Sequence, residues 1–248
     1  MIGVIGGSGL LGIEEWGSSR EEVIRTPYGE PSHAIKVSEL DDSEVAFIAR
    51  HGNPHHIPPH LINYRANLWA LDSLGVKTII SIATVGSIAP EIQPGDLVFP
   101  NQIIDYTSAR EHTFFDGLNN PLNHIDFTHP YENFLRSQLI ASSQNLQIKF
   151  IENGCYASVN GPRLETAAEI NRYEKDGATI VGMTGMPEAS LARELGISYA
   201  AICPVANHAA GRGLSKEGLS LDTINKNSKE MMTSVIKLIT EVIKKIGH

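Results

Sequence analysis

The sequence predicts a single α/β domain in which helices cover a central β-sheet, and three observations support this prediction. Short runs rich in Val and Ile alternate with helical patterns from one end of the chain to the other. The 248 residues correspond to between one and two domains of roughly 150 residues each. No internal repeat, low-complexity tract or Pro/Ser-rich linker divides the sequence, so we assign residues 1–248 to one domain.

The candidate strands are short apolar runs bounded by turn residues or polar residues. Runs of this composition suit the pleated, partly buried surface of a sheet. In chain order they are Ile2–Ile5, Ala34–Val37, Glu44–Ala49, Thr78–Ala83, Leu97–Phe99, Thr179–Val181 and Tyr199–Cys203.

Five segments have the apolar spacing of a helix, and several of these carry start or stop signals. Gly75 ends the first and Gly177 the third, while the fourth has Pro187 near its first turn and Gly196 just after its end. The first four are Leu61–Leu74, Pro130–Gln144, Glu165–Lys175 and Pro187–Leu195.

The last helix has the most regular pattern, with residues recurring at i, i+3 and i+4 over more than five turns. A stripe of Met and aliphatic side chains at this spacing is typical of a helix face that packs on a core. Its members are Ile224, Ser228, Met231, Met232, Val235, Leu238, Ile239, Val242, Ile243 and Ile246.

Residues 105–129 form the least regular stretch of the chain. A long loop of polar and aromatic residues in a compact domain is usually functional or interfacial. A simple surface excursion is the alternative, and the sequence leaves both open. The stretch holds Tyr106, Arg110, His112, Phe114, Phe115, His124 and His129.

Composition and charge exclude several classes of protein. Twenty Lys and Arg against 28 Asp and Glu give a formal net charge of −8, and no signature of a duplex-binding protein is present, so we expect no nucleic-acid partner. The only cysteines, Cys155 and Cys203, fit the reducing cytoplasm better than a disulfide framework. No basic residue precedes Arg20 as a signal peptide requires, and no apolar run reaches about 18 residues. We expect a cytoplasmic protein with no membrane partner.

The segment Gly7-Ser8-Gly9-Leu10-Leu11-Gly12 matches the dinucleotide-binding pattern G-x-G-x-x-G and follows a candidate strand. The pattern requires a helix directly after it, but the segment that follows is too short for one and is interrupted by Gly17. The pattern also requires an acidic residue at the end of a second strand about 20 residues further on, and none is present. A glycine-rich turn remains, whose N–H groups and Ser8 hydroxyl can approach an oxyanion closely. A plain tight turn is the alternative, and both stay open.

Polar side chains follow several candidate strands closely. These are Arg50 and His51, Thr84, and Thr184, the last of which also precedes a helix. Ligands of α/β sheets bind beyond the carboxyl ends of strands, Arg donates charge-assisted hydrogen bonds to phosphate, and helix N-termini favour anions. Together with Ser8, these residues predict a site for one phosphate, with its positive charge concentrated on Arg50.

Four histidines, His51, His55, His56 and His60, raise the question of a metal site. The prolines among them interrupt helical spacing, and no carboxylate or cysteine joins the cluster. We therefore expect no metal there.

Four motifs are informative when taken together: Gly6-Gly7-Ser8-Gly9, Arg50-His51-Gly52, residues 63–71 (Asn-Tyr-x-Ala-Asn-Leu-Trp-Ala-Leu) and residues 182–188 (Gly-Met-Thr-x-Met-Pro-Glu). With them the chain resembles the trimeric purine nucleoside phosphorylase/methylthioadenosine phosphorylase family, from residue 2 to about residue 245. The resemblance implies a mixed central sheet, a homotrimer, and reversible phosphorolysis by a pentosyltransferase. It also implies that inorganic phosphate is a co-substrate and that neither metal nor cofactor is needed.

The resemblance further assigns roles to individual residues. Met183 would line the ribose, Glu165 and Asn207 would face the base, and His124 would reach the neighbouring subunit's site near the ribose 5′ position. The residues that would hold phosphate are Ser8, Arg50, His51, Ala83 through its backbone, Thr84 and Thr184.

Phosphorolysis needs groups of this kind. Phosphate attacks the anomeric carbon while the purine leaves, through a transition state resembling an oxocarbenium ion, so a rigid phosphate site supplies proximity. Negative charge develops on the leaving purine, and polar groups at its edge stabilise the transition state more than the ground state. Asn207 is the candidate catalytic residue, because its amide can accept from a protonated N7 and donate to O6.

The polar residues of the base site favour a 6-oxopurine. Relatives resembling human methylthioadenosine phosphorylase have Asp-x-Asp where this chain has Asn207-His208-Ala209. An ionised carboxylate only accepts and suits an amino group, whereas an amide also donates and suits a 6-oxo group. An ionised Glu165 accepts from the N1–H of hypoxanthine or guanine, which adenine lacks, and such sites discriminate strongly.

The 5′ position favours a methylthio group. In the purine nucleoside branch a histidine on the last helix commonly serves the 5′-hydroxyl, but residues 219–224 hold none. Leu221 and Ile224 resemble the aliphatic wall that receives a methylthio group, with simple helix packing as the open alternative. The features together resemble the branch that acts on 5′-methylthioinosine.

Other functions stay open at this point. Within the enzyme class they are phosphorolysis of inosine or guanosine, and phosphorolysis of methylthioadenosine. Outside it, a non-catalytic nucleoside sensor would keep the pocket, although sensing a base needs no phosphate cradle. A dehydrogenase would use the glycine motif.

Overall fold

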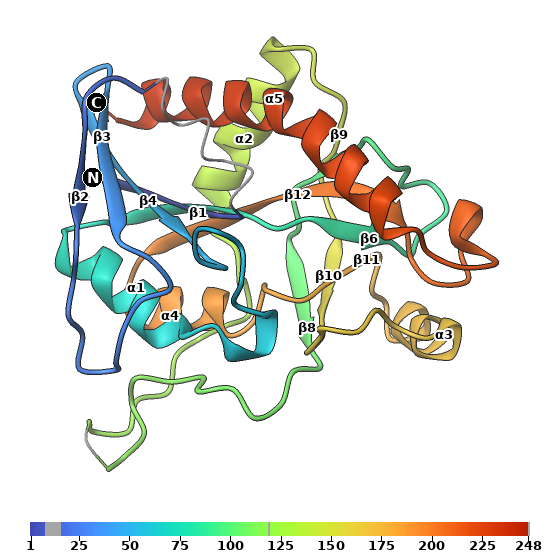
Figure 1. The fold of residues 1–248 in the computed structure, drawn as a ribbon, viewed down its shortest axis with the longest axis horizontal. Coiled ribbons are helices and arrows are strands. Elements are labelled where there is room, and N and C mark those ends of the chain that lie inside the picture. Colours follow the sequence, from blue (N-terminus) through green and yellow to red (C-terminus); the bar gives the residue numbers. More distant parts are fainter. Residues whose placement is uncertain (8–15, 119, 248) are drawn as a thin grey trace.

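One long strand, β12 (Ser198–His208), connects two halves of a mixed sheet in the computed structural model, which describes residues 1–7, 16–118 and 120–247 (Figure 1). The first half of β12 pairs with β5 (Thr78–Ile82), and its second half pairs with β6 (Val85–Ser87). Because β5 and β6 are separated by Ala83 and Thr84 alone, the chain crosses from one half of the sheet to the other at these two residues.

In the first half, parallel strands occupy the centre and antiparallel strands the edge. β1 (Ile2–Gly6) lies between β4 (Ser43–Ala49) and β5 and is parallel to both. β3 (Ile35–Leu40) and β2 (Ser19–Glu22) extend the sheet beyond β4 as an antiparallel edge. The parallel centre places the residues after β1, β4 and β5 at the same end of the sheet.

The second half runs from β6 through β11 (Ile180–Gly182) and β10 (Cys155–Ser158) to β8 (Gln102–Asp105). Since β11 is antiparallel to β6 while β10 is parallel to both its neighbours, the mixed sheet that the resemblance implies is confirmed. Two short strands, β7 (Leu97–Val98) and β9 (Phe150–Ile151), pair with each other, and β7 also pairs with β12.

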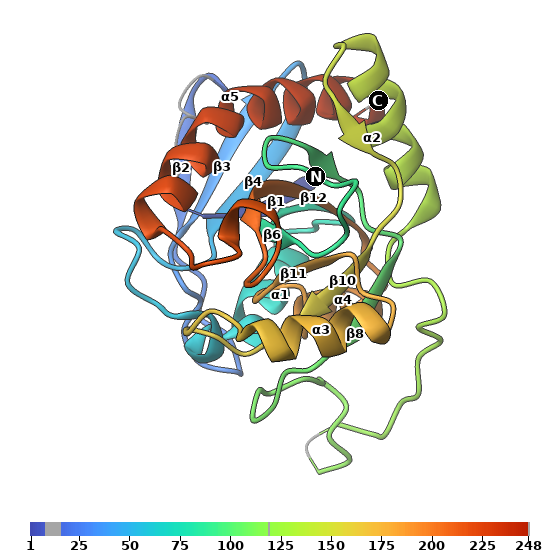
Figure 2. The same ribbon diagram turned by 90° about the vertical axis from the view of Figure 1, so that its right-hand side faces the viewer.

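Helices cover both faces of the sheet (Figures 1 and 2). α1 (Tyr64–Ser73) and α4 (Glu188–Glu194) pack on one face, where Leu68 and Leu191 join the buried cluster around Ile5. α2 (Asn133–Asn145) and α5 (Leu221–Ile246) pack on the other face, where Leu139 and Leu238 join a second cluster. α3 (Ala167–Lys175) covers the second half of the sheet, and short 3₁₀ helices lie at Pro59–Leu61 and Gly213–Ser215. The predicted single α/β domain is therefore confirmed.

The seven expected strands and five expected helices are all present, with ends that differ by a few residues. α3 begins at Ala167 rather than at Glu165, because the Thr166 side chain accepts from the backbone N–H of Glu169 and the Glu169 side chain accepts from the backbone of Thr166, which forms a capping box. The strands that sequence patterns missed are short or polar, namely β2, β6, β8, β9 and β10. β2, for example, reads Ser-Arg-Glu-Glu and is mostly exposed, so no apolar pattern marks it.

The irregular stretch predicted at residues 105–129 is confirmed as a loop. Among its described residues, nothing from 106 to 132 is helical or in a strand, and the segment, green in both views, extends away from the body of the domain (Figures 1 and 2). Arg110 anchors its start, because its guanidinium donates to the carbonyls of Asn160 and Met186 and to Tyr64 Oη. Leu118 and Leu122 are strongly exposed on its outer part. None of the described helices is long and apolar enough to cross a membrane.

Candidate active site

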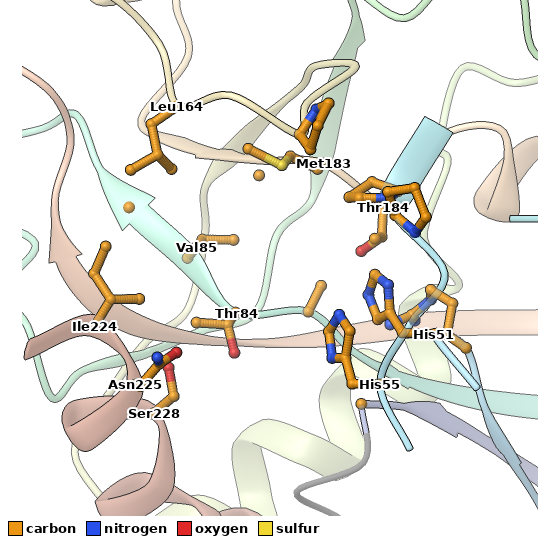
Figure 3. A pocket seen from close by; sticks show the side chains of 18 of the residues that line it. His51, His55, Thr84, Val85, Leu164, Met183, Thr184, Ile224, Asn225 and Ser228 are labelled. Atoms are coloured by element: carbon orange, nitrogen blue, oxygen red, sulfur yellow. The ribbon is translucent and has the colours of Figure 1, made fainter. Parts of the chain in front are cut away.

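The segments that follow β1, β4, β5 and β11 line one pocket together with β12 and α5 (Figure 3). The pocket has a volume of about 850 Å³, which suits a small organic ligand together with an anion. It contains most of the residues to which the sequence assigns a role. These are Arg50, His51, Ala83, Thr84, Glu165, Met183, Thr184, Asn207, Leu221 and Ile224.

Arg50, directly after β4, is almost completely buried and forms an ion pair with Glu188, the first residue of α4. Its Nε lies 2.6 Å from Glu188 Oε2 and its Nη2 lies 2.8 Å from Oε1. Nη2 also donates to Ser81 Oγ, and Nη1 donates to the carbonyl of Ile82. Within the described residues these bonds use four of the five N–H groups of the guanidinium, and the fifth, on Nη1, is left for a ligand.

The charge of Arg50 is therefore not free, which corrects the expectation of a positive charge concentrated on this residue. Burial by itself lowers the pKa of Arg50, but the charge and hydrogen bonds of Glu188 raise it above its ordinary value, so the guanidinium stays cationic. Glu188 neutralises that charge and receives further hydrogen bonds from Ser81 and Tyr199, at 2.6 and 2.8 Å. The network fixes the orientation of the guanidinium towards the pocket.

His51, the next residue, presents a neutral ring to the pocket. Burial, with the adjacent charge of Arg50, lowers the pKa of His51 to about 4. Its Nδ1 lies 2.9 Å from the carbonyl of Ile57, and its ring stacks on that of His55 at 4.3 Å between centroids. His55 and His56 line the pocket beside it, which the sequence did not assign.

Two threonines approach the same end of the pocket from different strands. Thr84 lies at the crossing between β5 and β6 and is exposed to the cavity. Thr184 follows β11, and its backbone N–H lies 3.4 Å from Tyr156 Oη. Figure 3 shows Thr84, Thr184 and His51 around one part of the cavity. Hydroxyls, an arginine N–H and a neutral imidazole together suit an oxyanion.

Asn207 and Glu165 bring amide and carboxylate groups to the pocket. The register of β12 against β6 shifts between Val205 and Asn207, so the strand is irregular where Asn207 lies. Nδ2 of Asn207 donates to the carbonyl of His208 at 2.6 Å, which leaves one N–H and the amide oxygen for a ligand. Burial raises the pKa of Glu165, which comes from the segment before α3.

The α5 wall of the pocket is more polar than the sequence indicated. Leu221 and Ile224 line it as expected, but Asn225, Ser228 and Lys229 line it as well. Their positions follow helical spacing from Leu221, so the same periodicity that marked the apolar stripe could have identified them. Ser228 and Met232 were assigned only to the packed stripe of this helix, and both line the pocket as well.

His208 and Ala209, expected in the base site, do not line this pocket. Side chains alternate along a strand, so with Asn207 facing the pocket His208 faces away. Its Nδ1 lies 3.0 Å from Ser87 Oγ, and it lines a separate cavity of about 240 Å³. Ala209 packs in the apolar cluster beside α3.

Two further expectations concern residues away from the described pocket lining. Ser8 lies outside the described residues, so its role stays a prediction. His124 is exposed on the loop that follows β8 and does not line the pocket of its own chain. No group of three or more His, Cys, Asp or Glu in the described part of the chain is arranged to hold a metal ion.

Comparison with known proteins connects this pocket to a family. A model described as "Phosphorylase superfamily" matches residues 1–244. The "Probable S-methyl-5'-thioinosine phosphorylase" of Thermodesulfovibrio yellowstonii is 45% identical, over 99% of this chain and 91% of that protein. The "6-oxopurine nucleoside phosphorylase" of Pyrococcus furiosus is also 45% identical, over 98% of this chain and 91% of that protein.

Solved structures share the fold over nearly the whole chain. Methylthioadenosine phosphorylase from Schistosoma mansoni in complex with adenine superposes with a TM-score of 0.93 and is 30% identical, covering 99% of this chain and 91% of that one. A methylthioadenosine phosphorylase from an antarctic soil metagenomic library gives a TM-score of 0.92 at 35% identity, covering 99% and 85%.

Proposed function

The chain belongs to the phosphorylase superfamily, and we propose that within it the protein cleaves 5′-methylthioinosine with phosphate, releasing hypoxanthine and 5-methylthioribose 1-phosphate. That it is a nucleoside phosphorylase, a pentosyltransferase, follows from the family and from relatives about 45% identical over nearly the whole chain. The observation that carries the choice of base is Asn207, whose amide keeps both an acceptor and a donor for a ligand.

The phosphate would lie among Arg50, His51, Thr84 and Thr184. The free N–H of Arg50 and the two hydroxyls would hold it below the anomeric carbon of the nucleoside. Because Ser81, Glu188 and Ile82 already fix the guanidinium, the site needs little rearrangement when phosphate binds. Attack then breaks the bond to the purine, forms the bond to phosphate, and leaves negative charge on the base.

The base would lie between Asn207 and Glu165. The Asn207 oxygen would accept from a protonated N7 and its remaining N–H would donate to O6, which spreads the charge of the leaving purine. Ionised Glu165 would accept from N1–H. Adenine carries no N1–H and has an amino group in place of O6, so both contacts would disfavour methylthioadenosine.

Phosphorolysis of inosine or guanosine is the second candidate. Asn225 and Ser228 offer polar groups on the α5 wall, where a nucleoside with a 5′-hydroxyl could find a partner. Leu221 and Ile224 on the same wall favour the methylthio group. A non-catalytic sensor is disfavoured by the buried Arg50 network, which nucleoside binding alone does not require.

The test is a substrate panel in phosphate buffer, following release of the free base. We expect the highest kcat/KM with 5′-methylthioinosine. A preference for methylthioadenosine would contradict the roles of Asn207 and Glu165, and equal use of inosine would contradict the role of the apolar wall. Nucleoside binding without base release would favour a sensor, while binding of NAD would favour a dehydrogenase.

Replacing Leu221 by Ser should lower the preference for the methylthio group. Loss of an apolar contact of this size weakens binding by about 1–3 kcal/mol, so the ratio of kcat/KM for methylthioinosine to that for inosine should fall roughly tenfold. Leu214→Ser is the matched control, because Leu214 is also exposed, precedes α5, and does not line the pocket. A ratio that changes equally in both variants would contradict the assignment.

We also propose that the protein forms a homotrimer in which His124 reaches a neighbouring pocket. The trimer is supported by the exposed loop that carries His124 and the apolar residues Leu118 and Leu122. We further propose that the protein is cytoplasmic and that its reaction needs no metal or cofactor. Sedimentation analysis tests the trimer, since a monomer would leave His124 without a site. Full activity after dialysis against a chelator tests metal independence.

A further inference from the structure

Arg110, near the start of the loop that follows β8, is a buried cation bonded to neutral oxygens. It is 8% exposed and does not line the pocket. Its Nη1 donates to Tyr64 Oη at 3.1 Å and to the carbonyl of Met186, while its Nη2 donates to the carbonyls of Val159 and Asn160 at 3.3 and 3.0 Å. All four N–H groups of the two terminal nitrogens are therefore in use. Because burying a charge is costly, a cation at this place requires such a set of acceptors.

The carbonyls that accept from Arg110 belong to two irregular segments of the pocket wall. Residues 159–165 follow β10 and include Glu165, whereas residues 183–186 follow β11 and include Thr184. Neither segment is helical or part of a strand, so these carbonyls lack the partners that a helix or sheet provides. Buried carbonyls need a hydrogen-bond partner, and Arg110 supplies one to both segments.

Tyr64, the first residue of α1, extends these contacts to a third segment of the wall. Its hydroxyl accepts from Arg110 and donates to the carbonyl of Pro59 at 3.0 Å. Pro59 ends residues 55–59, all of which line the pocket. The guanidinium of Arg110 also lies over the Tyr64 ring, 5.3 Å from its centroid, which is a favourable position for a cation. One buried side chain thus connects three segments that are far apart in the sequence.

We propose that Arg110 is a positioning residue, which holds three segments of the pocket wall in fixed positions relative to one another. Figure 3 shows one side chain from each segment, Leu164, Met183 and His55, around the cavity. Arginine suits this role because its planar fork offers donors in several fixed directions, whereas a lysine ammonium is a single point charge. The inference rests on the proposed function, since the three segments line its base and phosphate sites.

Steady-state kinetics of Arg110→Met, with nucleoside and phosphate varied in turn, test this role. A displacement of about 1 Å at the reacting groups costs about a hundredfold in rate, so kcat/KM per folded enzyme should fall by about tenfold to a hundredfold. The KM values for both substrates should rise, because segments at both ends of the pocket lose their contacts. A loss of stability alone would lower the fraction of folded enzyme, and therefore kcat, but would leave both KM values unchanged.

Arg136→Met is the matched control. Arg136, on α2, is also 8% exposed and donates to the carbonyls of Phe99, Pro100 and Glu152, but it does not line the pocket or contact the three segments. This variant should lose stability as Arg110→Met does, measured by denaturant unfolding, and should keep both KM values. Arg110→Lys should give KM values between those of the wild type and Arg110→Met, because one ammonium replaces some of the four bonds.

Unchanged KM values in Arg110→Met, or equal rises in Arg136→Met, would overturn the inference. Where Arg110→Met does not fold, Tyr64→Phe decides, because it keeps the ring and removes the hydroxyl between Arg110 and Pro59. Loss of these bonds should raise the KM for phosphate by about threefold to tenfold, and an unchanged value would contradict the role.

The wild-type substrate panel reports separately on the proposed function, since it involves none of these variants. If the wild type released no base, the proposed function would fail, and the dissociation constants of nucleoside and phosphate, measured by calorimetry, would take the place of the KM values. Weaker binding of both ligands to Arg110→Met than to Arg136→Met would still support the positioning role, and equal binding would overturn it.

Discussion

Asn207→Asp should lower kcat/KM for 6-oxopurine nucleosides by about a hundredfold or more, since loss of one well-placed donor to a developing negative charge costs on this order. In the structure Nδ2 of Asn207 bonds the carbonyl of His208 and leaves its other N–H for O6. A carboxylate loses that donor, places a negative charge beside the leaving purine, and meets the His208 carbonyl as a second acceptor. The same change should improve the relative use of 6-aminopurines, because a carboxylate can accept from their amino group.

Steady-state kinetics with methylthioinosine and methylthioadenosine measure both effects. Asn225→Asp is a matched control, since it introduces the same charge on the α5 wall of the same pocket. That variant should leave the choice between the two bases unchanged. If Asn207→Asp also left it unchanged, Asn207 would not read the base.

Arg50→Met should strongly weaken phosphate use and also destabilise the fold. Removing the guanidinium leaves Glu188 buried without its counter-charge, and breaking a buried pair in this way costs about 3–5 kcal/mol of unfolding free energy. The loss of the donor to phosphate should lower kcat/KM for phosphate by about a hundredfold or more. Denaturant unfolding and phosphate-dependent base release measure the two losses.

The double variant Arg50→Met/Glu188→Gln separates the loss of stability from the loss of phosphate use. The amide at residue 188 keeps an oxygen for Ser81 and Tyr199 and removes the uncompensated charge, so much of the stability should return. Phosphate use should stay low, because no donor replaces Arg50. Recovery of phosphate use together with stability would mean that Arg50 acts only as a structural partner of Glu188.

The sequence predicted the order of elements well wherever a residue pattern reports directly on burial. Apolar runs marked the central strands β1, β4 and β5, and the stripe on α5 marked its packed face. The strands it missed, such as β2 and β9, are short and polar or half-buried, so pairing with neighbours rather than composition makes them strands. Local periodicity contains no information about such pairing.

The chemistry of the pocket was predictable in part, because apolar runs mark where the strands end and therefore which side chains follow them. Arg50, His51, Thr84 and Thr184 follow strands, and parallel strands bring their carboxyl ends to one edge of the sheet. The failure at His208 came from extending a motif along a strand, since neighbouring side chains of a strand face opposite sides. Glu188 belongs to one of the motifs in the sequence, but its role as the ion-pair partner of Arg50 could not be predicted from that motif.

What the sequence determined by itself is the set of elements and the kinds of side chain at their ends, because both depend on residues close together in the chain. What only the tertiary structure decided is which of those side chains meet. Arg50 and Glu188 are 138 positions apart, and their pairing changes an exposed cation into a buried, neutralised donor. Likewise, helical periodicity shows that Asn225 and Ser228 share a face with Leu221, but only the packing of α5 against the sheet decides that this face lines the pocket. Contacts of this kind depend on how distant segments pack together, and no local pattern specifies them.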